Sequence, residues 1–254
     1  MRSIQRPLRT NRRLSRHKAR PLEHWRTIPL SPATPSPRSP SPHSASPRPA
    51  AAASGSPREI LLTHNGGVWQ GLFIRLDGQG RERERFDSHL DVAERQGTIH
   101  ADLTNRSSGT VRSMQFDDPP AEMQISPAGH WSLGPDRIGA WPWVCELCLV
   151  WGEQRRRIVV RHGLTDLESL VLVGEGRPGH EPTPPAAPLQ VQPQIVDPHH
   201  RRWTLEQHPS VIVTTMAGRE PGLPEVVSLL WEPEPGISLC LSRRYDQFGL
   251  LQPL

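Results

Sequence analysis

Two arginines, Arg75 and Arg112, are the residues whose type and position most directly suggest chemistry. Arg75 is two residues from Phe73, and Arg112 is four residues from Phe116, in runs that alternate like strands. Side chains an even number of positions apart on a strand point to the same face. If these faces line the interior of a barrel, the two guanidinium groups would hold a ligand carboxylate or propionate. If the faces are exterior, both arginines are ordinary surface residues; the sequence leaves both interpretations open.

The cysteines form a C-x-x-C pair that does not predict a metal or redox site. Cys145 and Cys148 lie inside the apolar run 143–151, which has the character of a strand, and Cys240 stands alone. Residues i and i+3 of a strand point to opposite faces, so the pair cannot bind one metal or close a short disulfide. We therefore predict buried structural thiols.

The adjacent His199 and His200 are the remaining candidates for metal binding. They follow Asp197-Pro198, and His208 is the only further histidine nearby, whereas a metal site needs three or four ligands. A solvated loop is therefore predicted. The chain also lacks a G-x-S-x-G elbow, a P-loop and a dinucleotide-binding fingerprint. We predict no catalytic residue, no metal and no cofactor, and expect a protein that is not an enzyme.

Charge is distributed unevenly along the chain. Residues 1–58 contain eleven Arg and one Lys against a single acid, Glu23, a net of +11. The remainder carries 18 basic and 25 acidic residues, a net of −7, and the two parts give the +4 of the whole chain. Because binding to nucleic acid needs a basic face, the folded part is expected to have no nucleic-acid partner.

Residues 1–58 are predicted to be a disordered basic tail. Their repeated Ser-Pro and Pro-x-Pro units hold the backbone extended and leave few apolar groups to bury. Three interpretations remain open for this tail. It is a transit-like leader, a basic arm for nucleic acid or anionic membrane, or the product of a start codon assigned too far upstream.

Three signals bear on where the protein resides. No run approaches the roughly 20 consecutive apolar residues that span a bilayer. The N-terminus lacks the apolar core of a secretory signal. An odd number of cysteines, three, argues against a disulfide framework and for a reducing compartment. We expect a soluble intracellular protein without a transmembrane segment.

A period of two begins at Gly66 and continues to Gly174. The apolar members of four such runs are Phe86, Leu90 and Val92; Ile99, Ala101 and Leu103; Ala121, Met123 and Ile125; and Ile158 and Val160. Turn signals separate the runs at 77–80, 106–109, 117–120, 126–129 and Gly163. Alternation of this kind predicts strands with one buried face, and about eight or nine short strands predict an antiparallel up-and-down barrel or a sandwich.

A second Pro- and Gly-rich stretch divides the rest of the chain. We expect a barrel over 59–175, a linker over 176–193 and further strands over 194–254. About 60 residues are too few to close a barrel of the ~8 strands that a filled interior requires. The last segment is thus a partial second barrel or sheet, which either packs on the first barrel or stands as a shortened second one.

Two motifs carry a resemblance to a known family. The run 67–80 (GVWQGLFIRLDGQG) begins with the G-x-W of a lipocalin first strand, and the run 242–249 (SRRYDQFG) resembles an Arg-Arg-Tyr-Asp-x-x-Gly turn. Both are similar to motifs of a cyanobacterial lipocalin-like (calycin) family of unknown function. The residues that match are Gly67, Trp69, Gly71, Phe73, Arg243, Arg244, Tyr245, Asp246 and Gly249.

The resemblance implies a structural role for Trp69. In lipocalins the tryptophan of this motif plugs the closed end of the barrel, and an arginine near the last strand packs over its ring. Arg161 is a candidate for that arginine. The alternative is that Trp69 is a core aromatic without a particular role.

The resemblance also implies a function. Members of the family have two calycin-type barrels and are related to a chloroplast factor that assists ATP synthase assembly; the superfamily also includes phycobilin lyases. We therefore expect a non-enzymatic binding or assembly protein of a photosynthetic organism, with ATP synthase subunits or another photosynthetic complex as partner. The alternative is a carrier of a bilin or small hydrophobic ligand, or a chromophore lyase, that uses the barrel lumen. The compartment implied is the cyanobacterial cytoplasm, or the plastid stroma if the tail is a transit peptide.

Overall fold

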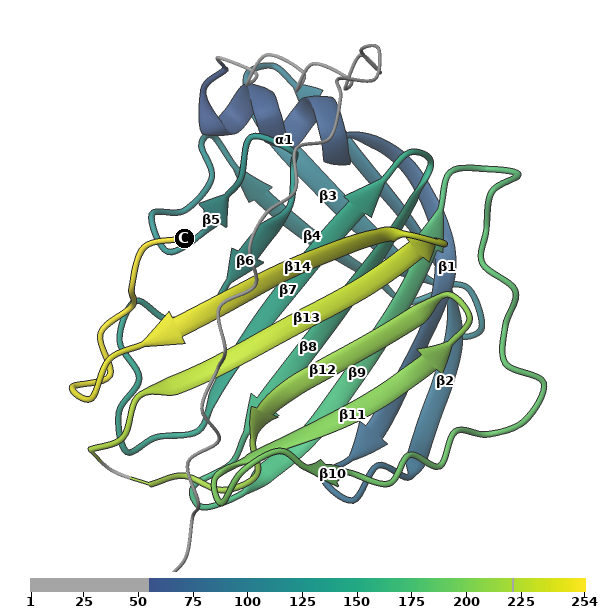
Figure 1. Ribbon diagram of the computed structural model, residues 1–254. Coiled ribbons are helices and arrows are strands. Elements are labelled where there is room, and N and C mark those ends of the chain that lie inside the picture. The colour runs from purple at the N-terminus through teal and green to yellow at the C-terminus, as the bar shows by residue number, and fades with distance from the viewer. Residues whose placement is uncertain (1–54, 221) are drawn as a thin grey trace, which may run out of the picture. The chain divides into compact units, whose positions relative to one another are not determined.

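The computed structural model describes residues 55–220 and 222–254, which belong to one compact unit. The described residues contain one helix and fourteen strands (Figure 1). Their bounds are α1 (Pro57–Asn65), β1 (Gly67–Asp77), β2 (Glu82–Arg95), β3 (Thr98–Asn105), β4 (Val111–Phe116), β5 (Gln124–Ile125), β6 (Trp131–Leu133), β7 (Trp143–Trp151), β8 (Gln154–His162), β9 (Leu167–Gly176), β10 (Gln194–Ile195), β11 (His200–Gln207), β12 (Ser210–Met216), β13 (Glu225–Glu234) and β14 (Ile237–Tyr245). Residues 1–54 of the predicted disordered tail lie outside the described part of the chain.

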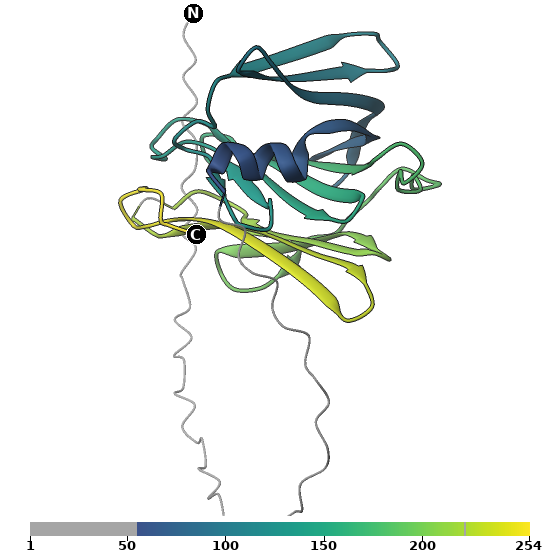
Figure 2. The same ribbon diagram turned by 90° about the horizontal axis from the view of Figure 1, so that it is seen from above.

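Nine strands form one antiparallel sheet in the order β4-β3-β2-β1-β9-β8-β7-β6-β5. Each strand lies beside its neighbour in sequence, except that β1 pairs with β9 and the sheet ends at β4 and β5. The sheet is therefore an up-and-down meander curled into a half-barrel, as Figure 2 shows from above. The prediction of an all-β, antiparallel up-and-down fold is confirmed, with a half-barrel in place of a closed barrel.

The other five strands form a second sheet in the order β10-β11-β12-β13-β14. This sheet lies against the convex face of the half-barrel, where Leu72 and Ile158 share one hydrophobic core with Trp203 and Trp231 (Figure 2). Segment 194–254 thus packs on the half-barrel, and its apolar side chains have the first sheet as their partner.

Alternation along the strands divides the first sheet into two faces. Even-numbered residues of β1 such as Leu72 and Ile74 point to the second sheet, whereas Trp69 on the same strand points to the concave face. The concave face has a core of its own, in which Leu90 and Ile99 pack with Trp69. Strands β7 to β9 are consequently buried on both faces in most of their length.

Helix α1 is an element that the strand pattern did not predict. Its start is a capping box, in which the Ser56 Oγ accepts a hydrogen bond from the Glu59 amide and the Glu59 carboxylate accepts one from the Ser56 amide. Pro57 at the first helical position suits the fixed φ of proline. The helix is too short for a persistent 3.6-residue period, and S-x-x-E after Gly55 is the signal that would have found it.

The predicted strand over 121–125 is mostly absent. Only Gln124 and Ile125 pair, with β6, and the Met123 amide donates instead to the Pro120 carbonyl at 2.8 Å. Pro119 and Pro120 have no amide hydrogen to give to a strand ladder, so the chain turns there. The alternation at 121–125 is real, but it is too close to this turn to extend the sheet.

Candidate functional site

The concave face of the half-barrel changes character from the α1 end to the open end. Next to α1 lies a closed apolar layer around Trp69. A buried layer of charges around Glu175 follows, and beyond it lies an open cavity of about 650 Å³. The cavity is the candidate functional site, and the two other layers form its closed end.

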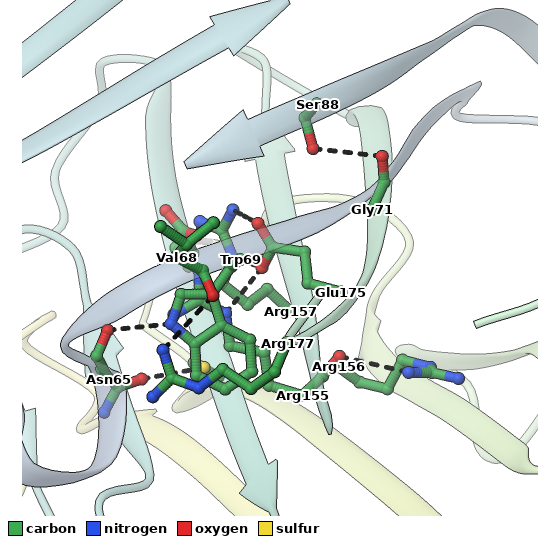
Figure 3. A network of polar contacts seen from close by, with 12 residues as sticks. Asn65, Val68, Trp69, Gly71, Ser88, Arg155, Arg156, Arg157, Glu175 and Arg177 are labelled. Carbon is green, nitrogen blue, oxygen red and sulfur yellow. Dashed lines mark hydrogen bonds and ion pairs between the residues drawn. The ribbon is translucent and has the colours of Figure 1, made fainter. Parts of the chain in front are cut away.

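Trp69 closes the barrel at the α1 end. Its ring is fully buried and lies between two guanidinium groups, with Arg155 4.2 Å and Arg177 3.9 Å from the ring centroid (Figure 3). Its Nε1 donates to the Asn65 carbonyl at the end of α1 at 3.0 Å. Because Arg155 and Arg177 take this position, the assignment of Arg161 as the arginine over Trp69 is wrong.

Glu175 is the centre of the charged layer. Its carboxylate accepts hydrogen bonds from Arg155 Nε at 2.7 Å and from Arg157 Nε at 2.8 Å (Figure 3). Burial alone would raise the pKa of Glu175, but the two arginines outweigh it and lower the pKa to about 2. Arg157 also pairs with Glu146, and the two carboxylates together raise the pKa of Arg157 against the effect of burial. The layer is a permanently ionised floor below the cavity.

The cavity itself has an aromatic and aliphatic lining. Phe73 of β1 and Phe86 of β2 stack with ring centroids 4.8 Å apart, and the Arg157 guanidinium lies 5.4 Å from the Phe73 centroid. Aliphatic walls come from Leu103, Val159 and Val171. The interior can therefore take the apolar part of a ligand, with the aromatic pair as its base.

Four arginines surround the opening of the cavity. Two are paired with acids, because Arg75 lies 3.4 Å from Glu84 and Arg83 lies 2.6 Å from Asp77. Arg112 of β4 and Arg161 of β8 line the same opening, and neither has an ion pair within 4.0 Å among the described residues. These two guanidinium groups are the ones free to take a ligand anion.

Arg75 and Arg112, singled out from the sequence, line one cavity together on the concave face. Arg161 was considered for a different role, and Phe86 was recognised only as a core position. The sequence does not show that Phe86 and Arg161 line the same opening, because their strands, β2 and β8, meet there only through the curl of the sheet.

The first-strand motif residues lie around Trp69. Gly67 begins β1, and a Cβ there would meet the Arg177 guanidinium that covers Trp69. Gly71 lies where β1 comes so close to β9 that a Cβ would overlap the Gly174 carbonyl and the Glu175 backbone. Both glycines therefore serve the close packing of the plug, and neither reaches the cavity opening.

The C-terminal motif joins the second sheet to the half-barrel. Arg243 is fully buried and donates to the carbonyls of Glu122, Gly134 and Pro135 at 2.8–3.0 Å. Its Nε donates to Tyr245 Oη at 2.7 Å, and that hydroxyl donates onward to Pro135 at 2.9 Å. The pair thus binds the segment just before β5 and the connection between β6 and β7.

The rest of the C-terminal motif forms a turn. The Asp246 carboxylate accepts the Phe248 amide at 2.8 Å and the Leu250 amide at 2.9 Å, and Gly249 has a φ of +75°. Arg244, next to the buried Arg243, is exposed. The motif lies away from the cavity lining.

Cys145 and Cys148 lie on opposite faces of β7, as their spacing requires. Cys145 belongs to the core between the two sheets and Cys148 to the concave core. Burial raises the pKa of both thiols to about 12, so neither is a nucleophile near neutral pH. Cys240 is exposed.

His199 and His200 each lie against a carboxylate. His200 Nδ1 lies 2.9 Å from the Asp197 carboxylate, and His199 Nδ1 lies 2.9 Å from Glu220. Within residues 55–220 and 222–254, no group of three or more His, Cys, Asp and Glu side chains is arranged to hold a metal.

A second cavity, of about 740 Å³, lies between the Pro-rich connection after β9 and the β11–β12 turn. Its buried charged group, Arg156, already donates to Glu206 Oε2 at 3.0 Å and lies over the Trp231 ring. The lining is otherwise rich in glutamine amides and lacks an exposed aromatic side chain. The first cavity, with its two unpaired arginines, is therefore the better candidate.

The part of the chain that the structure describes has no helix with the length and apolar character needed to cross a membrane.

Neither a protein-family model nor a curated protein sequence matches the chain. A solved structure is similar in fold: a protein of unknown function from the DUF3598 family of the cyanobacterium Nostoc punctiforme, with a TM-score of 0.62 and 17% sequence identity. The similarity covers 78% of this chain and 96% of that chain. The chain therefore shares its fold with a cyanobacterial protein of unknown function.

Proposed function

We propose that this chain is a non-enzymatic, lipocalin-like binding protein that holds an amphipathic carboxylate in its half-barrel. The observation that carries the proposal is the cavity of about 650 Å³, lined by a stacked aromatic pair and by two arginines that have no ion pair within residues 55–220 and 222–254. The apolar part of the ligand lies on Phe73 and Phe86. Its carboxylate lies between Arg112 and Arg161, whose planar guanidinium groups suit two-point hydrogen bonding.

The charges around the opening support an anion of low charge. Arg75 and Arg83 are already compensated by Glu84 and Asp77, so Arg112 and Arg161 face a ligand together with one acid of the lining, Glu168, a net charge of +1. A long-chain fatty acid brings one carboxylate and a bilin brings two propionates. Both have enough apolar surface to use the aromatic base, and both remain candidates.

A titration with a fluorescent long-chain fatty acid, and separately with biliverdin, tests the proposal. Arg112→Leu and Arg161→Leu should each weaken binding about tenfold, the loss expected for a charge-assisted hydrogen bond at a partly exposed site. Arg75→Leu is the matched control, because it removes an arginine of the same opening that is already paired with Glu84. Equal affinity in all four proteins, or no binding by the wild type, would contradict the proposal.

The alternative is an assembly role, which the resemblance to the ATP synthase biogenesis factors implies. Affinity purification from a photosynthetic lysate would then recover ATP synthase subunits with the protein and no bound small molecule. That result would favour an assembly role over ligand binding.

A further inference from the structure

Connections at the end of the half-barrel away from α1 carry exposed large apolar side chains. Trp141 is 79% exposed, Leu164 63% and Phe248 68%. Single exposed apolar residues are common on protein surfaces and need no explanation. These three are different because they come from separate connections of the chain that are joined to one another. We call Trp141, Leu164 and Phe248 the apolar tips.

Arg219 joins two of the connections that carry the tips. Its guanidinium donates to the Trp141 carbonyl at 2.8 Å and to the Gly139 carbonyl, and its amide donates to the Thr165 carbonyl at 2.8 Å. Leu164 precedes Thr165, so this single residue links the connection of Trp141 to that of Leu164.

A backbone hydrogen bond joins the third connection. The Ile138 amide donates to the Gly249 carbonyl at 2.9 Å, next to Phe248. Figure 1 shows the 246–250 turn in yellow and the connection after β12 at the lower left, with α1 at the top. The tips therefore stand on one set of turns that hydrogen bonds join to one another.

The tips adjoin the opening of the cavity. Leu164 lies in the turn between β8 and β9, and the residues on either side of that turn, Arg161 and Glu168, both line the cavity. The same surface that presents apolar side chains to solvent thus borders the entrance to the proposed ligand site.

Several charged groups among these connections are engaged locally, whereas Asp136 and Arg137 are exposed. Glu220 lies 2.9 Å from His199, and the Asp246 carboxylate accepts hydrogen bonds from amides of its own turn. The Arg219 guanidinium donates to backbone carbonyls. The most exposed apolar side chains of these connections are a tryptophan, a phenylalanine and a leucine, the types that partition into the interface of a lipid bilayer. Turn residues with exposed apolar side chains suit a fluid interface, whereas a helical peptide partner would need a groove.

We infer that the apolar tips insert into the interface of a neutral lipid bilayer, with the cavity opening turned toward the lipid. This orientation would let an amphipathic carboxylate pass between the bilayer and the cavity; that exchange rests on the proposed function, and the docking does not. We specify a neutral bilayer because an anionic one would repel these connections. The four connections, 135–142, 163–166, 217–223 and 246–250, carry more acids than arginines.

Sedimentation of the full chain with phosphatidylcholine vesicles tests the docking. The wild type should bind, and a Trp141→Ser/Phe248→Ser variant should lose about tenfold or more of its partitioning, since two aromatic groups leave the interface. Trp151→Ser is the matched control, because Trp151 is an exposed tryptophan at the end of β7 near α1. It should bind like the wild type.

Salt separates this docking from adsorption of the basic tail. Insertion of the tips should persist at high salt, whereas attraction of residues 1–58 to a surface is screened. Three results would overturn the inference: no binding of the wild type to neutral vesicles, equal binding by the Trp141→Ser/Phe248→Ser variant, or an equal loss in Trp151→Ser.

A parallel titration with the fatty acid in vesicle-free solution separates the two proposals. The Trp141→Ser/Phe248→Ser variant should keep the affinity of the wild type there, because neither side chain lines the cavity. Loss of vesicle binding with retained fatty-acid affinity supports the inference. A protein that docks to vesicles but binds no fatty acid would overturn the exchange and the proposed function, and leave the docking standing.

Discussion

The Arg155 guanidinium lies 4.2 Å from the centroid of the Trp69 ring, in the closed end of the half-barrel. Arg155 is the first of three consecutive arginines in β8, a run that would ordinarily be expected on a wet face. Here Trp69 shields it on one side and Glu175 neutralises it on the other. The plug of this barrel is thus an aromatic ring and an ion pair acting together, and its stability depends on Glu175 remaining ionised.

Glu175→Gln should destabilise the protein by about 3 kcal/mol, because it leaves the buried Arg155 without its counterion and Arg157 with Glu146 alone. The measurement is the free energy of unfolding in urea. Glu168→Gln is the control, since Glu168 is an exposed residue of the same strand. A loss in Glu175→Gln no larger than that of the control would show that the charged layer is not structurally required.

Arg243→Met should destabilise the protein strongly, whereas Arg244→Met should be nearly neutral. The two arginines are adjacent on β14, but only Arg243 is buried, and its loss leaves the Glu122, Gly134 and Pro135 carbonyls without their donor. Unsatisfied buried carbonyls cost about 1–3 kcal/mol each. Thermal unfolding of the two variants checks the difference, and similar melting temperatures would argue against Arg243 as the link between the sheets.

Gly249→Ala should cost more than Gly236→Ala. Both glycines have positive φ, +75° and +84°, so alanine is strained by about 1 kcal/mol at each. At Gly249 the new Cβ would also overlap the Ile138 carbonyl, whereas nothing lies within 4 Å of it at Gly236. Urea unfolding of both variants measures the difference, and equal losses would mean that the C-terminal turn does not pack tightly on the 135–142 connection.

The free energy of unfolding should decrease as the pH is lowered from about 6.5 to about 4, because of His162. Burial, followed by the charge of Arg219, lowers the pKa of His162 to about 4, so the unfolded chain takes up a proton in this range and the folded chain does not. The loss is on the order of 3 kcal/mol across the window, since each pKa unit corresponds to about 1.4 kcal/mol.

The difference between wild type and His162→Gln isolates this contribution. Glu225, whose pKa is raised by burial, titrates in both proteins and cancels in the difference. The stability of His162→Gln should be flatter from pH 6.5 to 4, and a wild-type slope retained in the variant would assign the effect to another group.

Local alternation predicted which side chains share a face. Phe73 and Arg75 lie together in the cavity because parity along one strand is fixed by the backbone. Arg112 reaches the same cavity from β4. The two cysteines of β7 separate to opposite cores for the same reason.

Contacts between distant strands could not be read from the sequence. The arginine over Trp69 is decided by how β8 and β9 register against β1, and the alternation of β8 does not show whether Arg155 or Arg161 stands there. The run 155–157 looks solvated in the sequence. It is buried because the second sheet covers one face of β8, and Glu175 compensates the charges on the other.

The most direct measurement of the central claim compares a long-chain fatty acid with the alcohol of the same chain length. The wild type should bind the acid about tenfold more tightly, because only the carboxylate meets Arg112 and Arg161. An Arg112→Leu/Arg161→Leu variant should bind the two compounds with the same affinity, near that of the wild type for the alcohol. The same preference for the acid in both proteins would contradict a cavity that binds carboxylates through these two arginines.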